Sequence, residues 1–569
     1  MNTSVKSIAL NSNKNSGTMK APEKDECATR SVLAVRTDFL RIPPFPGARI
    51  EPFVQARSPT TSGDALIDAI RQLRVGGTYW GAQPKLPEGC LLVRSAAAFR
   101  LCGEPGRKDV VVWGEQVEGP ALTMARAVVE DCDPWHMLSS AAAVFVDDND
   151  EIRVIAAVLG VRTYVHYRAT GTVSVEDSTA ERLLEQALQG FSFQNPFTLE
   201  VMSPSDAIEL CGFWRQMIDR NRKVGGGVGF AFWKQDHVAP LLWSGSGSFP
   251  FLRSARDAAS RAAIAVWRGR TSARDLALLE KRKIPLIEVE DGFLRSHGLG
   301  ADCVPPLSIT VDHLGAHYNP EKPSELECLL QEGTFDALLL ERAGRLRQAI
   351  VEAGIGKYER SDGLPLARPA GARLHILVPG QVEDDLAVQC GGSGLKSNLE
   401  LLMRVRAEEP DAFVLYKPHP DVLAGHRRGA IADRTCLNYA DKIIEGAAIS
   451  SLIDMVDEVH VNTSLAGFEA LLRGKRVTTH GVPFYAGWGL TRDLGPVPAR
   501  RTARRTLDEI VAAALLIYPR YLDPVTGLPC PAEVVVNRLT SAAAPQSGVL
   551  VRMRRFQGKL MRRFRGVVP

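Results

Sequence analysis

The chain has 569 residues, of which 45% are hydrophobic and 24% charged, as is typical of globular proteins with full cores. Its ten cysteines form no CxxC pair and no His/Cys cluster at zinc spacing, which argues against a disulfide framework and a structural zinc site. No stretch reaches the roughly 18 apolar residues that a membrane span requires, and no apolar segment with a cleavage site follows the start. We therefore expect a cytoplasmic protein.

The first two segments are predicted to lie outside any complete module. Residues 1–30 are polar, and we expect a disordered start. Residues 31–225 are interpreted as a degenerate, partial Rossmann-like module without catalytic function.

Residues 226–370 are predicted to form a Rossmann-like half. The runs "VGFAFW", "AAIAVW" and "IPLIEVEDGFL" are expected to be strands, and "SELECLLQEGTFDALLLERAGRLRQAIVEAG" supplies helices.

Residues 371–540 are predicted to form a second Rossmann-like half. The strands "RLHILVP", "AFVLYK", "DEVHV" and "KRVTTH" are expected to alternate with the helices "SNLELLMRVRAEE", "LAGFEALLRG" and "TLDEIVAAALLIY". This alternation indicates βα units on a parallel sheet. Two such halves facing a cleft predict an α/β fold of the GT-B type, although the pattern also fits an epimerase or a binding protein.

An internal repeat relates the first module to the last. Residues 141–165 parallel residues 456–480, and Asn195-Pro196-Phe197-Thr198 parallels Asp523-Pro524-Val525-Thr526. The earlier copy has "WGEQV" in place of "YKPHP", so we expect it not to bind the ligand of the later copy.

Two motifs in the later half predict a nucleotide site. "YKPHP" follows a strand and places Lys417 and His419 at the carboxyl end of the sheet, where such folds bind ligands. In "NTSLAGFEALL", Thr463 and Ser464 are predicted at the N-cap and first turn of a helix, a common anion site, and Glu469 could accept from ribose hydroxyls. Ordinary turns and helix capping would explain either motif alone.

Acidic residues follow two other predicted strands. Glu290, Asp291 and Arg295 lie in "VEDGFLRSHGLG", where acids can act in general acid/base catalysis or simply form a solvated turn. "HILVPGQVEDD" ends in Glu383, Asp384 and Asp385 after a proline-glycine turn.

These segments, with "YKPHPDVLAGHRRG", "PFYAGWGLT" and "DPVTG", resemble the capsule polysaccharide biosynthesis/export family of the KpsC/LipA type over about residues 228–540. The resemblance implies a retaining β-Kdo glycosyltransferase of GT-B type that uses CMP-Kdo to build a short Kdo linker on a lysophospholipid. Full-length members resemble two tandem complete modules, whereas the first module here lacks the motifs. We therefore expect one active site.

The resemblance also implies roles for site residues. Asp385, which closes the "QVxxD" motif that begins at Gln381, would be the nucleophile, with Asp384 the alternative one position away. Glu290 is the candidate acid/base and Asp291 the second choice. Among the substrate-binding residues, Lys417, His419, Ser464 and Thr463 would hold the phosphate, Glu469 the ribose and Gln381 the substrate. Arg295 would either bind the Kdo carboxylate or brace Glu290.

We predict metal-independent chemistry without a cofactor, because no DxD motif sits where a GT-A enzyme would hold its metal and Kdo supplies its own carboxylate. The expected partners are a nucleotide sugar, a lipid-linked saccharide acceptor and other capsule assembly or export proteins, and no nucleic acid. The basic tail, residues 541–569, includes "LVRMRRFQGKLMRRFRG" with apolar residues at helical spacing, which predicts peripheral contact with the inner face of the inner membrane and equally fits a solvated basic end. Rival functions are a transferase of another nucleotide-sugar donor and a non-catalytic capsule assembly component.

Overall fold

The computed structural model describes most of the chain. The described residues are 39–50, 54–56, 64–102, 109–114, 126–128, 131–189, 191–259, 262–294, 304–355, 368–369, 371, 373–425 and 427–541. The expected disordered start, the basic tail beyond Ser541, and Arg295 lie outside them. The described strands form four sheets, two of which face the candidate site, and no described helix is long and apolar enough to cross a membrane.

The first of these two sheets has seven strands in the order β11-β10-β12-β13-β14-β21-β22. Their bounds are β10 Val224–Val228, β11 Phe251–Leu252, β12 Ala263–Val266, β13 Leu286–Asp291, β14 Ser308–Asp312, β21 Pro519–Leu522 and β22 Pro529–Cys530. Strands β10 to β13 pair in parallel, and β14 and β21 pair antiparallel. The last two strands therefore come from the chain's C-terminal part and complete the sheet of the preceding half.

One predicted strand of this half is wrong. "VGFAFW" is not a strand beyond Val228, because the chain turns at Gly229 and helix α7 (Phe232–Leu242) begins three residues later. Gly229 has φ +84°, and a Cβ there would lie 2.3 Å from Thr271 Oγ1. The turn places Lys234 in the first turn of the helix, where it faces the site.

The second sheet has six strands, ordered β17-β16-β15-β18-β19-β20 and all parallel. The bounds are β15 His375–Pro379, β16 Phe413–Lys417, β17 Lys442–Ile443, β18 Glu458–Val461, β19 Arg476–Thr479 and β20 Arg492–Asp493. Its connecting helices include α11 Leu386–Gly391, α12 Asn398–Glu408, α13 Pro420–Leu423, α14 Asp433–Cys436, α15 Ile449–Met455 and α16 Leu465–Leu472. The four predicted strands and the first two predicted helices are confirmed. The third, "TLDEIVAAALLIY", divides into α17 (Leu507–Val511) and a π-helical turn (Ala512–Ile517).

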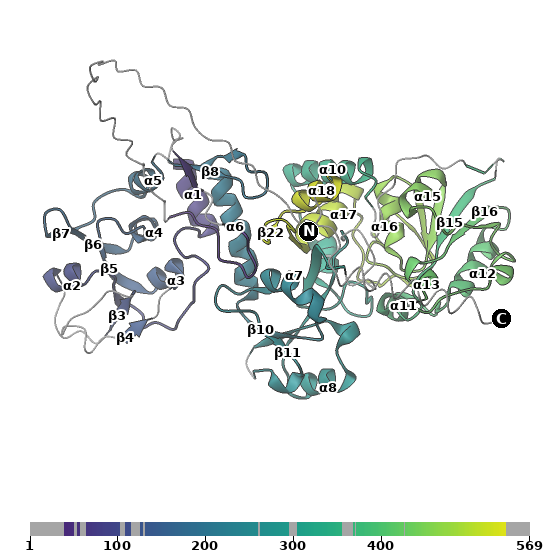
Figure 1. Cartoon of the computed structure of the whole chain (residues 1–569), viewed down its shortest axis with the longest axis horizontal. Helices are drawn as coiled ribbons and strands as arrows, with labels where there is room; N and C mark the ends of the chain where they lie inside the picture. The colour runs from purple at the N-terminus through teal and green to yellow at the C-terminus, as the bar shows by residue number, and fades with distance from the viewer. Residues whose placement is uncertain are drawn as a thin grey trace, which may run out of the picture. The chain divides into compact units, whose positions relative to one another are not determined.

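The two halves are joined by helices from distant parts of the sequence. Helix α9 is Glu325–Glu332, α10 is Ala337–Glu352 and α18 is Ala532–Thr540. Helices α10, α17 and α18 lie side by side in Figure 1, and α10 contacts both α17 and α18. Phe293, just beyond β13, stacks on Phe484 of the other half with 4.5 Å between ring centroids. Both rings are buried, and each contributes about 1.5–3 kcal/mol of apolar stabilisation.

The internal repeat is confirmed in the described residues. The first module has a six-stranded sheet of order β4-β3-β2-β5-β6-β7, the same connectivity as the second sheet above. Its strands are β2 Cys90–Val93, β3 Val110–Trp113, β4 Arg126–Val128, β5 Ala141–Asp147, β6 Arg162–Tyr167 and β7 Thr172–Val175, and its helices are α1 Asp64–Leu73, α2 Ala96–Cys102, α3 Pro134–Ser139, α4 Ile152–Leu159, α5 Ala180–Leu188 and α6 Pro204–Asn221. The copies differ at the edge, where β7 pairs antiparallel with β6 and β20 pairs parallel with β19.

The turn that ends each copy has the same geometry. The Asn195 side chain accepts from the N–H groups of Phe197 and Thr198, and Asp523 accepts from those of Val525 and Thr526. The turns lie between paired antiparallel strands, β8 (Phe191–Gln194) with β9 (Val201–Met202) and β21 with β22. A third strand, β1 (Val54–Ala56), pairs with β8 as β14 pairs with β21.

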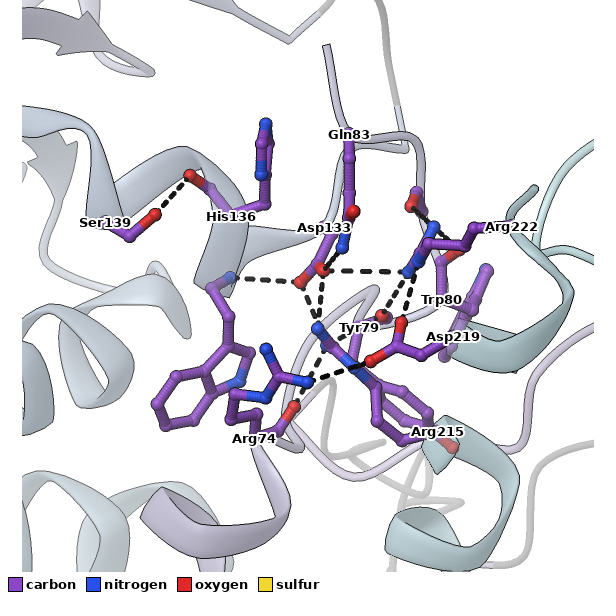
Figure 2. A network of polar contacts seen from close by, with 12 residues as sticks. Arg74, Tyr79, Trp80, Gln83, Asp133, His136, Ser139, Arg215, Asp219 and Arg222 are labelled. Atoms are coloured by element: carbon purple, nitrogen blue, oxygen red, sulfur yellow. Dashed lines mark hydrogen bonds and ion pairs between the residues drawn. The ribbon is translucent and has the colours of Figure 1, made fainter. Parts of the chain in front are cut away.

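A buried ion pair holds α6 to the rest of the first module. Figure 2 shows Arg215 of α6 reaching Asp133, with distances of 3.0 Å and 2.7 Å from its two terminal nitrogens to the two carboxylate oxygens. Asp133 also caps α3 by accepting from Trp135 N–H, and Asp219 accepts from Arg215 Nε at 2.9 Å. Both members of the central pair are fully buried, so the network fixes α6, which leads directly into β10.

Candidate active site

A cavity of about 760 Å³ is lined by residues that follow strands of both large sheets. Nine of the ten predicted site residues line it, and the tenth, Arg295, lies outside the described residues. The cavity residues from the sequence analysis are Glu290, Asp291, Gln381, Asp385, Lys417, His419, Thr463, Ser464 and Glu469, and Asp384, the alternative nucleophile, lines it as well. The carboxyl ends of β13, β15, β16 and β18 therefore converge on one space.

The second sheet presents hydrogen-bond donors to this space. His419 is the N-cap of α13, and its Nδ1 accepts from the N–H of Asp421 at 3.1 Å. In the neutral imidazole the proton is then on Nε2, which can donate to an anion. Ser464 is the N-cap of α16, and its Oγ accepts from Ala466 N–H at 3.2 Å. The expected position of Ser464 in the first turn is thus wrong by one residue, because Thr463 precedes the cap.

Lys417 and Glu469 occupy buried positions in the same wall. Lys417 ends β16, and its carbonyl accepts from Gly380 N–H at 2.8 Å. A Cβ on Gly380 would lie 2.7 Å from Tyr416 Oη, so glycine permits this close approach of two loops. Glu469 lies within α16 and lines the cavity beyond the cap.

Gln381 joins two of the loops. Its Nε2 donates to Thr463 Oγ1 and its Oε1 accepts from Thr463 N–H, both at 3.0 Å. Asn398 holds Gln381 from behind through two 2.8 Å hydrogen bonds with its backbone. Gln381 and Thr463 thus fix the positions of the loops after β15 and β18 in addition to lining the cavity.

The three consecutive acids have different environments. Glu383 accepts from the N–H of Asn398 at 2.9 Å, which makes it part of the loop's own bonding. Asp384 forms an exposed ion pair with Arg427, with oxygen to Nε distances of 3.2 Å and 3.3 Å. Asp385 is the N-cap of α11, where one oxygen, Oδ1, accepts from Ala387 N–H at 2.9 Å. Each of the three acids therefore has a different partner.

Opposite these residues, Glu290 and Asp291 end strand β13. Burial raises the pKa of Glu290 to about 7, with further raising effects from Asp291 and Asp385 and a lowering effect from Lys234. Lys234 Nζ lies 2.9 Å from Asp291 Oδ1 and 3.5 Å from the centre of the Trp267 ring. Glu290 is therefore suited to exchange a proton near neutral pH.

Sequence reasoning missed several cavity residues. Lys234, Trp267 and Tyr318 line the cavity but lie in segments of the sequence without a motif. Burial, Glu290 and Glu288 raise the pKa of Tyr318, so its phenol stays protonated and can donate a hydrogen bond. Arg270 and Arg427 also line the cavity. Lys234 alone among these residues carried a local signal. It follows Trp233 at the start of a helix, and a cation in such an apolar segment needs a partner if it is buried.

The corresponding edge of the earlier copy is filled by its own polar side chains. Arg94 Nε lies 2.6 Å from Asp150 Oδ2, and Asp147 accepts from Ser95 Oγ at 2.7 Å. His166 Nδ1 lies 3.0 Å from the same Asp147 oxygen. The loop after β5 presents carboxylates where the loop after β18 presents hydroxyls, which is unfavourable for a phosphate.

The fold and site define an α/β protein with parallel sheets and a polar cavity at their carboxyl ends. A family model described as "Capsule polysaccharide biosynthesis protein" matches residues 262–364 and 367–521. The capsule polysaccharide modification protein LipA of Neisseria meningitidis serogroup A is 40% identical over 357 residues, 62% of this chain and 50% of LipA. The lipopolysaccharide-processing protein LpsZ of Rhizobium meliloti is 45% identical over 272 residues, 47% of this chain and 61% of LpsZ.

A solved structure named "Thermosulfurimonas dismutans KpsC, beta Kdo 2,4 transferase" is 33% identical, with a TM-score of 0.49, and covers 56% of this chain and 98% of that chain. Its counterpart named "beta Kdo 2,7 transferase" is also 33% identical, with a TM-score of 0.46, and covers 56% of this chain and 99% of that chain. This chain belongs to the capsule polysaccharide biosynthesis family of the KpsC/LipA type. It spans about half the length of its LipA relatives.

Proposed function

We propose that the chain is a glycosyltransferase of GT-B type that transfers Kdo with retention from CMP-Kdo to a lipid-linked Kdo acceptor during capsule biosynthesis. The observation that carries the proposal is the convergence in one cavity of Asp385 and Glu290 with the donors at His419 and Ser464. Membership of the KpsC/LipA type supports Kdo as the sugar, and the facing sheets support the GT-B architecture.

The first chemical step assigned to this site is displacement of CMP. An Asp385 oxygen attacks the anomeric carbon of Kdo while the bond from that carbon to the phosphate oxygen breaks, and CMP leaves with the electron pair. His419 Nε2–H, Ser464 and Lys417 stabilise the negative charge that develops on the phosphate. The second oxygen of Asp385 is available for attack while Oδ1 accepts from Ala387.

The second step returns Asp385 to its free form. A hydroxyl of the acceptor attacks the anomeric carbon, the bond to Asp385 breaks, and the hydroxyl proton goes to Glu290. A pKa of about 7 matches this use of Glu290 as a base at neutral pH. Asp291, held by Lys234, serves to position and polarise this base.

The division of the chain is proposed as in the sequence analysis, with residues 31–225 as a non-catalytic module and residues 226–370 and 371–540 as the two halves of the catalytic one, except that β21 and β22 complete the sheet of the first half. The carboxylate-filled edge of the first module supports its lack of donor binding. Capsule assembly proteins and the inner face of the inner membrane are proposed as partners of the whole protein.

Donor selection tests the proposal. The purified chain is incubated with freshly generated CMP-Kdo and a mono-Kdo lipid, and in parallel with UDP-hexoses and the same lipid. We expect the wild-type chain to form a β-Kdo-extended product with CMP-Kdo and no product with UDP-hexoses. The Asp385→Ala variant should form no product with either donor. Product from a UDP-sugar, or no CMP release from CMP-Kdo by the wild-type chain, would refute the proposed donor.

A further inference from the structure

The cations that line the cavity differ in how they are paired. Lys234 is buried against Asp291, and Arg427 pairs with Asp384. Lys417 and His419 each have polar partners within the protein as well. Arg270, by contrast, is exposed, and its side chain has no ion pair or hydrogen bond with any residue that the structure describes.

The short turn that carries Arg270 lies close to both candidate reacting carboxylates. This turn, η3 (Arg268–Arg270), contacts β13, which ends in Glu290 and Asp291. A Cβ on Gly269 would lie 3.7 Å from Leu386 Cδ1, directly beside Asp385 at the start of α11. The turn therefore lies beside elements from both walls of the cavity.

The backbone of this turn is held firmly. Arg268 forms an ion pair with Glu288 through Nε, at 2.8 Å, and through a terminal nitrogen. Thr271 caps the turn by donating its hydroxyl to Trp267 O at 2.9 Å. Arg270 is thus presented from a rigid support, which lowers the entropy cost of holding a ligand.

We propose that Arg270 forms a carboxylate-binding subsite that recognises the acid group of the sugar at the reaction centre. The inference rests on the proposed function for the identity of that sugar. A guanidinium group can form two parallel hydrogen bonds with a carboxylate, and inside a partly closed cavity these are stronger than in water. The phosphate has other donors, on the loops after β16 and β18, so Arg270 is left to a second anion.

The carboxylate can belong to the donor sugar or to an acid sugar of the acceptor, since both reach the carbon that Asp385 and Glu290 flank. The hydrogen bonds to Arg270 are the same for either source, but the two sources predict different kinetics. A donor carboxylate affects the release of CMP without acceptor, whereas an acceptor carboxylate affects transfer alone.

The first test measures binding and needs no turnover. Calorimetric titrations of free Kdo and of Kdo methyl ester, at saturating CMP, compare the wild type with Arg270→Ala, Arg270→Lys and the control Arg274→Ala, whose side chain is exposed and outside the cavity lining. We expect the wild type and the control to prefer the acid by about 10- to 100-fold, Arg270→Ala to lose this preference, and Arg270→Lys to retain part of it. Retention of the full preference in Arg270→Ala, or no preference in the wild type, would overturn the inference.

The second test locates the carboxylate. CMP release from CMP-Kdo is measured for the same variants with and without a mono-Kdo acceptor. If CMP release by Arg270→Ala falls about 10- to 100-fold without acceptor, the subsite belongs to the donor. If only the transfer rate of this variant falls, the subsite belongs to the acceptor. Rates for Arg270→Ala within twofold of the Arg274→Ala control in both assays would overturn the inference. Absence of CMP release by the wild type would refute the proposed function, while the binding comparison would still decide the role of Arg270.

Discussion

The ammonium group of Lys234 lies 2.9 Å from Oδ1 of Asp291, the residue next to Glu290. Lys234 is 6% exposed and also lies over the Trp267 ring. Its charge lowers the pKa of Glu290, while burial and two neighbouring acids raise it to about 7. A base must be ionised to accept a proton, so we expect the rate of transfer to fall as pH decreases through about 7.

Lys234→Met should move this decline to higher pH, because it removes the charge that favours ionised Glu290. The pH profile of kcat for transfer measures the shift, and Lys234→Arg should restore the wild-type profile. Lys281→Met, at the exposed end of helix α8 (Ala273–Lys281), is the control. An unchanged profile in the folded Lys234→Met protein would contradict the role given to Lys234.

Covalent trapping should separate Asp384 from Asp385. In Glu290→Gln, release of the sugar to the acceptor should slow by about 10²- to 10⁴-fold, so a Kdo adduct accumulates on the chain. Peptide mass spectrometry should place the adduct on Asp385. Combining Glu290→Gln with Asp385→Ala should remove the adduct, whereas combining it with Asp384→Ala should leave it, because Asp384 pairs with Arg427 at the surface. An adduct on Asp384 would show that the motif was interpreted one position off.

His419→Asn should slow CMP release by about 10²- to 10³-fold. Asparagine can still cap α13, as His419 Nδ1 does for Asp421 N–H, but it does not reproduce the Nε2–H donor. The change therefore isolates the donor from the cap. Rates equal to wild type, measured by CMP release at saturating CMP-Kdo, would exclude His419 from stabilising the leaving phosphate.

Metal removal should leave transfer unchanged, since the proposed charge stabilisation comes from side chains and a helix N-terminus. The assay is repeated after dialysis against EDTA, with and without added Mg²⁺ or Mn²⁺. Loss of activity in EDTA and recovery with a divalent ion would show that a metal takes part.

Asp133→Ala should lower the free energy of unfolding by about 3 kcal/mol, because buried Arg215 would lose the carboxylate that binds its two terminal nitrogens and keep only Asp219. Asp68→Ala removes an exposed ion pair with Arg71 and should cost about 0.5 kcal/mol or less. Urea denaturation measures both. The double variant Asp133→Ala/Arg215→Met should be more stable than Asp133→Ala alone, and a further loss would contradict this account of the network in Figure 2.

Most elements of the two Rossmann-like halves follow from local sequence. Apolar runs such as "HILVP" and "FVLYK" become buried strands because side chains of this kind must leave water, and Ser464 and Asp385 begin helices because their oxygens accept from free N–H groups. Motifs that follow these strands converge at one edge of a parallel sheet, which is why nine site residues could be named in advance. The strand predicted at "VGFAFW" failed because a glycine turn outweighed its apolar character.

The sequence by itself determined most strands and helices, the repeat and the family. Only the tertiary structure decided how side chains far apart in the chain share charge and hydrogen bonds. It paired Lys234 with Asp291, joined Gln381 to Thr463 and returned β21 to β14. It also separated Glu383, Asp384 and Asp385, which look alike in sequence, because each finds a different partner in the fold. These distinctions depend on distances of a few ångströms, and local periodicity carries no information about them.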